Sequence, residues 1–91
     1  MTSNVTITQL EAEIADLNLI CGKKQAEYND VRAQQTRDRI ALIDSGLATQ
    51  QIIELQKEVQ EEMKFIQQQL NLIQQRLSEK EKALGNLINI N

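Results

Sequence analysis

The side chains that could carry out chemistry are few and widely separated. The 91-residue chain has no His, which removes the commonest general base and the commonest nitrogen ligand of metals. Its single cysteine, Cys21, can form neither an internal disulfide nor a thiolate metal site. Adjacent carboxylates such as Glu61 and Glu62 diverge on a helix. We therefore expect no catalytic residue, no cofactor and no bound metal, and a protein that is not an enzyme.

The apolar residues form one long pattern along the chain. Seventeen of the 24 positions in an unbroken three-four heptad spacing from Ile7 to Leu87 are apolar. We label as a every seventh residue from Ile7 to Leu84, and as d every seventh residue from Leu10 to Leu87. Apolar side chains that recur every 3.5 residues form a seam that another helix can cover. The pattern therefore predicts helices packed against helices.

Polar residues weaken this seam in the middle of the chain, between Gln35 and Gln56. This region contains Asp44-Ser45-Gly46, and Gly most readily takes the left-handed conformation in which helices commonly end. We therefore predict an all-α fold, a long antiparallel helical hairpin that resembles a coiled coil and associates into a helical bundle. The hairpin forms a single domain of residues 1–91, with helices at about 8–44 and about 49–85 and a turn at about 45–48.

Local signals suggest where the helices begin and end. Thr8-Gln9-Leu10-Glu11 fits a capping box, and either Thr49 or Ser45 could cap the second helix. Gly85 followed by Asn86 supplies a stop signal. Two alternatives stay open: a break at Gly22 would give three helices, and a continuous helix through Gly46 would give a single rod.

Apolar residues away from the seam predict a second contact surface. Phe65 and Leu72 lie one heptad apart at c positions, and Ile40, Ile43 and Leu47 form a group near the turn. Exposed apolar stripes commonly mark interfaces, and an isolated hairpin has little stability margin. We therefore predict that these five residues contact a partner or a second copy, with a dimer of hairpins as the simplest closed assembly. The alternative is that Phe65 and Leu72 only cover the hairpin edge.

Composition argues against nucleic acids and membranes as partners. The net charge is −3, the sequence pI is about 4.9 and aromatic residues make up 2%, although Arg32, Arg37 and Arg39 form a locally basic segment. Phosphate binding needs a positive field, and binding to single strands needs aromatic stacking platforms. No run of apolar residues has the length of a membrane span, and residues 1–5 do not resemble a signal peptide. We therefore expect a cytoplasmic location.

These observations predict a self-associating coiled-coil adaptor, assembly factor or small chaperone that binds a helical protein partner. One alternative is a hairpin dimer that binds structured RNA through its arginines. The other is a substrate of a specialised secretion system. Asp44-Ser45-Gly46 resembles the Trp-x-Gly turn of the small hairpins exported by type VII secretion in its Gly, but it has Asp where those proteins have Trp. This last resemblance is therefore one of outline.

Overall fold

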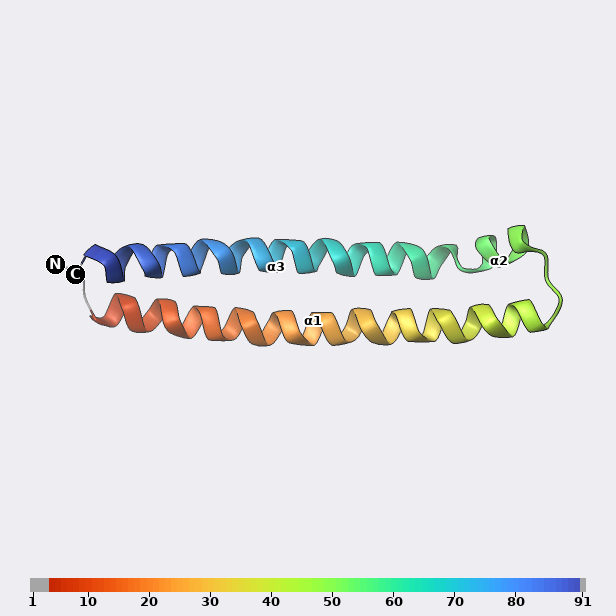
Figure 1. Ribbon diagram of the computed structural model, residues 1–91, viewed down its shortest axis with the longest axis horizontal. Helices are drawn as coiled ribbons and strands as arrows, with labels where there is room; N and C mark the ends of the chain where they lie inside the picture. The colour runs from red at the N-terminus through yellow and green to blue at the C-terminus, as the bar shows by residue number, and fades with distance from the viewer. Residues whose placement is uncertain (1–3, 91) are drawn as a thin grey trace.

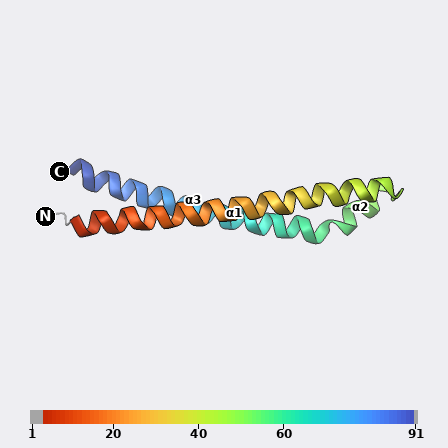
Figure 2. The same cartoon turned by 90° about the horizontal axis from the view of Figure 1, so that it is seen from below.

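The structure, a computed structural model, describes residues 4–90 and the side chains of residues 5–89. The described chain is an antiparallel helical hairpin, which confirms the predicted fold class (Figure 1). Its first arm is helix α1 (Asn4–Asp44), and its second arm consists of α2 (Thr49–Leu55) and α3 (Lys57–Ile90). The arms cross at a shallow angle (Figure 2). The overall shape is a rod of 68 × 16 × 16 Å.

The heptad seam is the surface along which the two arms pack. Every a and d position is buried or half-buried except Asp38, Ser45 and Thr49, which lie in the predicted weak region around the turn. The buried apolar side chains among the described residues all belong to the second arm: Ile52, Met63, Ile66 and Leu70. The core therefore follows a single line between two helices.

The turn between the arms spans residues 45–48. Gly46 has a φ of +83°, the left-handed conformation that the Asp44-Ser45-Gly46 motif predicts. The backbone N–H of Ser45 donates to the Ala41 carbonyl at 3.0 Å, and that of Gly46 donates to the Ile43 carbonyl at 3.0 Å. These bonds satisfy carbonyl groups that the end of α1 leaves without helical partners. A single rod is thereby excluded.

The second arm begins at residue 49 as predicted, but neither predicted capping residue is the N-cap observed. Helix α1 begins at Asn4, one turn before Thr8, so the Thr8 to Glu11 segment lies inside the helix. The earlier start brings Ile7 onto the seam, where it is half-buried, and this burial favours another helical turn. The N-cap of α2 is Ala48, whose N–H donates to Gln51 Oε1 at 3.0 Å. Thr49 is already helical.

Helix α3 continues through Gly85 as far as Ile90, beyond the predicted end near residue 85. An interior Gly costs a helix about 1 kcal/mol relative to Ala, but continuing the helix places Leu87 half-buried on the seam, and burial of a Leu side chain is of similar or larger value. Gly22 likewise lies inside α1 without breaking it. The heptad pattern therefore outweighs both glycines.

The second arm is interrupted at Gln56, which the sequence analysis does not predict. Gln56 has a φ of −95° and a ψ of 3°, outside the α-helical range. Its side chain is buried at an a position, and Nε2 donates to the Gln35 carbonyl of α1 at 2.9 Å. A buried amide needs such a partner, and we attribute the kink to the orientation that this bond requires. The backbone bonds from Gln56 N to Ile52 O and from Gln60 N to Gln56 O persist.

Two glycine replacements should change stability in opposite directions. Gly46→Ala should lower the free energy of unfolding by about 1 kcal/mol, because an L side chain is strained at positive φ. Gly85→Ala should raise it by roughly 0.5–1 kcal/mol, because Ala is the better helix former and its Cβ meets open space. Urea unfolding followed by circular dichroism measures both. Equal midpoints for the two variants would contradict the assignment of the turn and of the extended α3.

Candidate functional site

The residues considered for chemistry do not converge in the structure. Cys21 is free and half-buried on the seam. Glu61 and Glu62 are exposed on the second arm. Among the described residues, no group of three or more His, Cys, Asp or Glu side chains could hold a metal ion. The surfaces that remain as candidate sites are apolar.

The first candidate surface, the α3 patch, consists of Phe65 and Leu72. Their exposed fractions are 59% and 56%, so neither side chain is covered by the opposite arm. Leu72 borders a groove between the arms that is also lined by Lys24, Gln69 and Ile73. Gln69 Oε1 is buried there without a hydrogen-bond partner, which costs free energy locally. The patch is therefore an exposed apolar surface beside an imperfectly satisfied section of the seam.

The second candidate surface, the turn patch, consists of Ile40, Ile43 and Leu47. Ile40 and Ile43 are 55% and 56% exposed on the last turns of α1. Leu47 lies in the turn and is half-buried. It lines a shallow groove together with Gln51, Glu54 and Leu55 of α2, and neither Ile40 nor Ile43 belongs to that lining. The structure thus brings the three residues to one end of the hairpin, far along the rod from Phe65 and Leu72.

A longer apolar surface lies on α1 at heptad positions other than a and d, and it is not predicted from the seam pattern. One row of this surface takes every seventh residue, and all of its members are apolar and exposed: Val5, Ala12, Leu19, Ala26, Ala33 and Ile40. A second row lies three residues further along, and its members are exposed and uncharged: Thr8, Ala15, Gly22, Asn29, Thr36 and Ile43. We call these two rows the outer strip. The outer strip is recognisable in the sequence when each of the remaining heptad positions is followed along α1.

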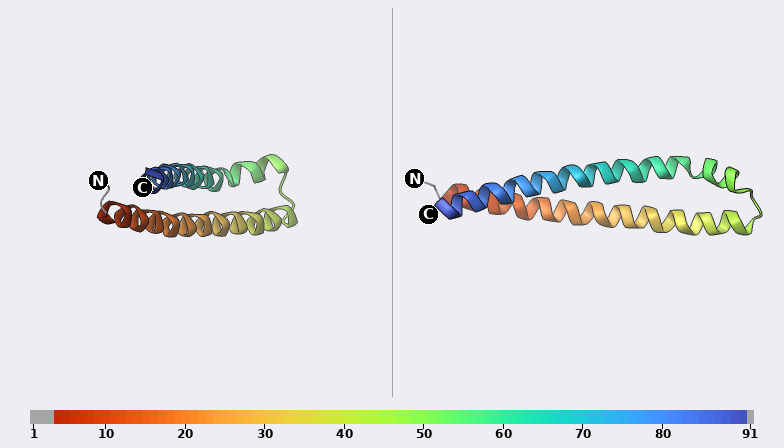
Figure 3. Two further views of the ribbon diagram at one scale, coloured as in Figure 1. Left: turned by 60° about the vertical axis from the view of Figure 1, so that its left-hand side comes forward. Right: turned by 45° about the horizontal axis from the view of Figure 1, so that its top comes forward.

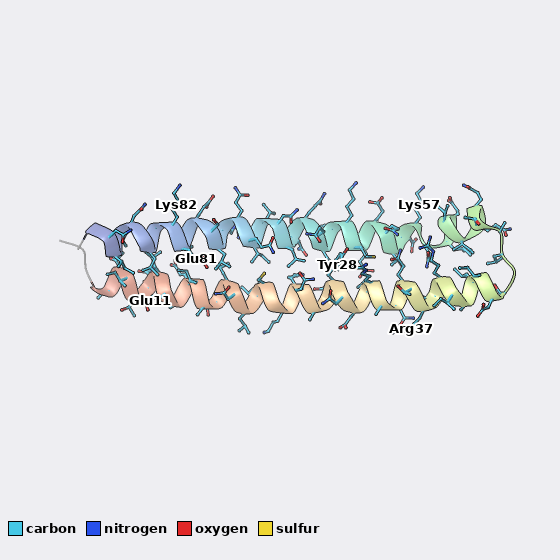
Figure 4. The ribbon with its side chains drawn as sticks, viewed as in Figure 1. Glu11, Tyr28, Arg37, Lys57, Glu81 and Lys82 are labelled. Atoms are coloured by element: carbon cyan, nitrogen blue, oxygen red, sulfur yellow. The ribbon has the colours of Figure 1, made fainter. Side chains whose placement is uncertain are left out.

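The second arm has no equivalent of the outer strip. The same heptad position that is apolar throughout α1 is polar or charged along α2 and α3, where it holds Glu54, Glu61, Gln68, Gln75, Lys82 and Asn89. Figure 4 shows Lys57 and Lys82 projecting from the outer side of the second arm, whereas Tyr28 lies between the arms. Two views from other directions show the two arms in one layer, with nothing covering the outer side of either (Figure 3). Helix α1 is therefore apolar on two opposite sides and α3 mainly on one.

Two lysines at d positions pass their ammonium groups beyond the apolar seam, as long side chains can. Lys80 Nζ lies 2.8 Å from Glu13 Oε2 and so joins α3 to α1. Lys24 Nζ lies 3.2 Å from Glu27 Oε2 within α1. The hydrogen bond from Lys80 holds the pKa of Glu13 below its ordinary value of 4.5, while partial desolvation opposes this effect. The pair therefore favours the observed alignment of the arms.

The arginines of the basic segment are exposed on α1. Arg37 projects from the outer side of α1 (Figure 4) and donates to Gln34 Oε1 at 2.7 Å. Asp38 lies between Arg37 and Arg39 in the sequence and partly offsets their charge. The geometry therefore gives the RNA hypothesis no further support.

Comparisons with known proteins give no functional information. The chain matches no protein-family model, no curated protein and no solved structure. None of the described helices is both long enough and apolar enough to cross a membrane.

The Glu13–Lys80 ion pair should make hairpin stability depend on pH. Because the pKa of Glu13 is lowered on folding, the contribution is complete above pH 4.5 and is lost as the pH falls through the lowered pKa. Lys80→Gln should therefore lower the urea midpoint slightly at pH 7 and leave it unchanged at a pH well below 4. Lys82→Gln, on the outer side of α3, is the matched control. The assignment fails if both variants show the same pH profile.

Proposed function

We propose that this protein is a non-enzymatic protein–protein interaction module, a self-associating coiled-coil adaptor, assembly factor or small chaperone. The observation that carries the proposal is the exposure of large apolar side chains away from the seam. Ile40, Ile43, Phe65 and Leu72 are each more than half exposed, on two different arms. Groups of exposed large apolar side chains often mark sites of protein association.

The energetics of the hairpin support the same proposal. Complete burial of a large aliphatic or aromatic side chain contributes about 1.5–3 kcal/mol, and the exposed members of the two patches retain much of that free energy for association. The buried apolar core among the described residues is confined to Ile52, Met63, Ile66 and Leu70. A hairpin with so small a core is stabilised by anything that binds only the folded form. Docking against another helix would provide both effects.

A helical partner suits the shape of these surfaces. Phe65 and Leu72 are seven residues apart on α3, and Ile40 and Ile43 are three apart on α1, so each pair lies on one side of its helix. Helices recognise such rows by placing their own apolar residues at the same spacings. Because the patches lie on different arms, one could contact a partner while the other contacts a second copy. That arrangement is what an adaptor requires.

Charged replacement of the α3 patch tests the proposal. The double variant Phe65→Glu, Leu72→Glu should lose recovery of its partner protein from cells of the native host, because docking would bury two unpaired carboxylates. Its helical circular dichroism should stay unchanged, because both side chains are exposed and Glu is a good helix former. Affinity recovery followed by mass spectrometry, with light scattering for the molar mass, provides the measurement.

The matched control is Gln68→Glu, Gln75→Glu, which adds the same charge at the same spacing on the polar outer side of α3. The control should recover the partner as the unaltered protein does. If the α3 patch variant and the control recover the same proteins in the same amounts, the patch is not a binding surface and the proposal loses its main support.

A further inference from the structure

We infer that the outer strip of α1 binds the outer strip of a second copy of this chain, with the two α1 helices antiparallel. The inference rests on the proposed function and adds the face and the direction of self-association. The strip runs from Val5 to Ile43 without one charged residue. An uncharged face of this length on a helix whose opposite side already forms the seam has no role within the hairpin.

Side-chain size makes the strip complementary to itself in one direction. Its larger aliphatic residues are Val5 at one end, Leu19, and the neighbouring Ile40 and Ile43 at the other end, and smaller residues occupy the positions between these three places. An antiparallel two-fold arrangement places a large residue against a small one towards the ends and small residues together at the centre. The facing pairs are Ala12 with Ile43, Ala15 with Ile40, Leu19 with Thr36, Gly22 with Ala33 and Ala26 with Asn29. No layer then contains two large residues, and the central layers are the smallest, so the two helices can approach each other most closely at the centre.

Two polar members of the strip, Thr36 and Asn29, have hydrogen-bond partners within their own helix. Thr36 Oγ1 donates to the Arg32 carbonyl at 3.0 Å, and Asn29 Oδ1 accepts from Gln25 Nε2 at 3.2 Å. These bonds can persist when the strip is covered, so burial leaves fewer polar atoms unpaired than it would if Thr36 and Asn29 had bonded only to water. The strip can thus be covered by apolar side chains at a small desolvation cost.

Gly22 has no structural purpose inside the hairpin. It lies in the interior of α1, and a Cβ at this position would meet nothing within 4 Å. The hairpin would therefore accept Ala, which favours a helix by about 1 kcal/mol over Gly. A second backbone approaching closely at this point makes the absence of a side chain useful, because interaxial distance depends on the side chains at the contact.

The charged residues beside the strip distinguish the two directions of pairing. In the antiparallel arrangement Asp16 lies beside Arg37 of the second copy, and Lys23 lies beside its Asp30. In a parallel arrangement Glu11 would face Asp16 and Arg32 would face Arg37, against a single opposite-charge pair, Arg39 with Asp44. Opposite charges at flanking positions favour one partner orientation, and like charges disfavour the other. The flanks therefore select the antiparallel pair.

The resulting assembly is a layer of four helices in which the two α1 helices are central and the two α3 helices are outermost. The outer face of α3 stays in solvent, in agreement with its polar and charged residues. Phe65 and Leu72 stay accessible, because they lie on α3 and away from the outer strip. Self-association and capture of a partner are thus assigned to different surfaces and can be tested independently.

Spin-label distances test the orientation in the otherwise intact chain. Labels are attached at Gln25→Cys or at Gln9→Cys in a Cys21→Ser background, each variant by itself. In the antiparallel pair the two labels at position 25 should lie within about 20 Å of each other, because this position is close to the two-fold axis. The two labels at position 9 should be separated by about 55 Å along the axis. A parallel pair would give short distances at both positions and would overturn the inference.

Charged replacements in the outer strip test whether this face of α1 forms the dimer contact. Leu19→Glu, Ala33→Glu should reduce the molar mass by light scattering from twice the chain mass of 10.4 kDa to that mass, with unchanged helicity. Gln68→Glu, Gln75→Glu adds the same charge on the outer side of α3 and should remain dimeric. The α3 patch variant Phe65→Glu, Leu72→Glu should also remain dimeric.

The outcomes separate this inference from the proposed function. A dimer that dissociates in the α3 patch variant but not in the outer strip variant overturns the inference and leaves the interaction module intact. A protein that is monomeric at high concentration overturns the inference too, and the partner recovery experiment then decides the proposed function. If that monomer loses its partner in the outer strip variant, the strip binds a helix of a different protein.

Discussion

Two helices touch along a single line, and this constraint determines the rest of the structure. A hairpin can fully cover only the side chains on that line, so its core is one residue wide. The described residues follow this rule, since the buried apolar side chains are Ile52, Met63, Ile66 and Leu70, and the seam residues of α1 are at most half-buried. The chain has two aromatic residues: Tyr28 is half-buried on the seam, and Phe65 is exposed. The two arms therefore form the whole fold, but many of their large apolar side chains stay exposed to solvent.

The two arms use their remaining surface differently. The second arm has one main apolar side and a polar outer side, which is the usual pattern for a helix between a core and solvent. Helix α1 has an apolar seam on one side and the outer strip on the other. A helix with two opposite apolar sides is typical of a position between two neighbours. In this hairpin α1 has one such neighbour, and the outer strip is the side that a second helix could occupy.

The heptad spacing and Gly46 were sufficient to predict the hairpin, because both are local features that the tertiary packing reinforces. The capping box at Thr8 and the stop at Gly85 failed because each contributes about 1 kcal/mol, and burial of Ile7 and Leu87 further along the seam outweighs it. The kink at Gln56 depends on a hydrogen bond to Gln35, 21 residues away in the sequence, which no local pattern encodes. The exposure of Phe65, Leu72, Ile40 and Ile43 followed from heptad position alone, but the outer strip was missed because only one spacing was counted.

The slenderness of the rod changes how the molecule moves through solution. Its radius of gyration is 20.2 Å, whereas a compact domain of the same length has about 12 Å. Friction rises with elongation, so the protein diffuses and sediments more slowly than a sphere of 10.4 kDa. On a sizing column a single hairpin would elute at the position of a considerably heavier globular standard. Elution volume is therefore a poor guide to the number of chains in this protein's assemblies.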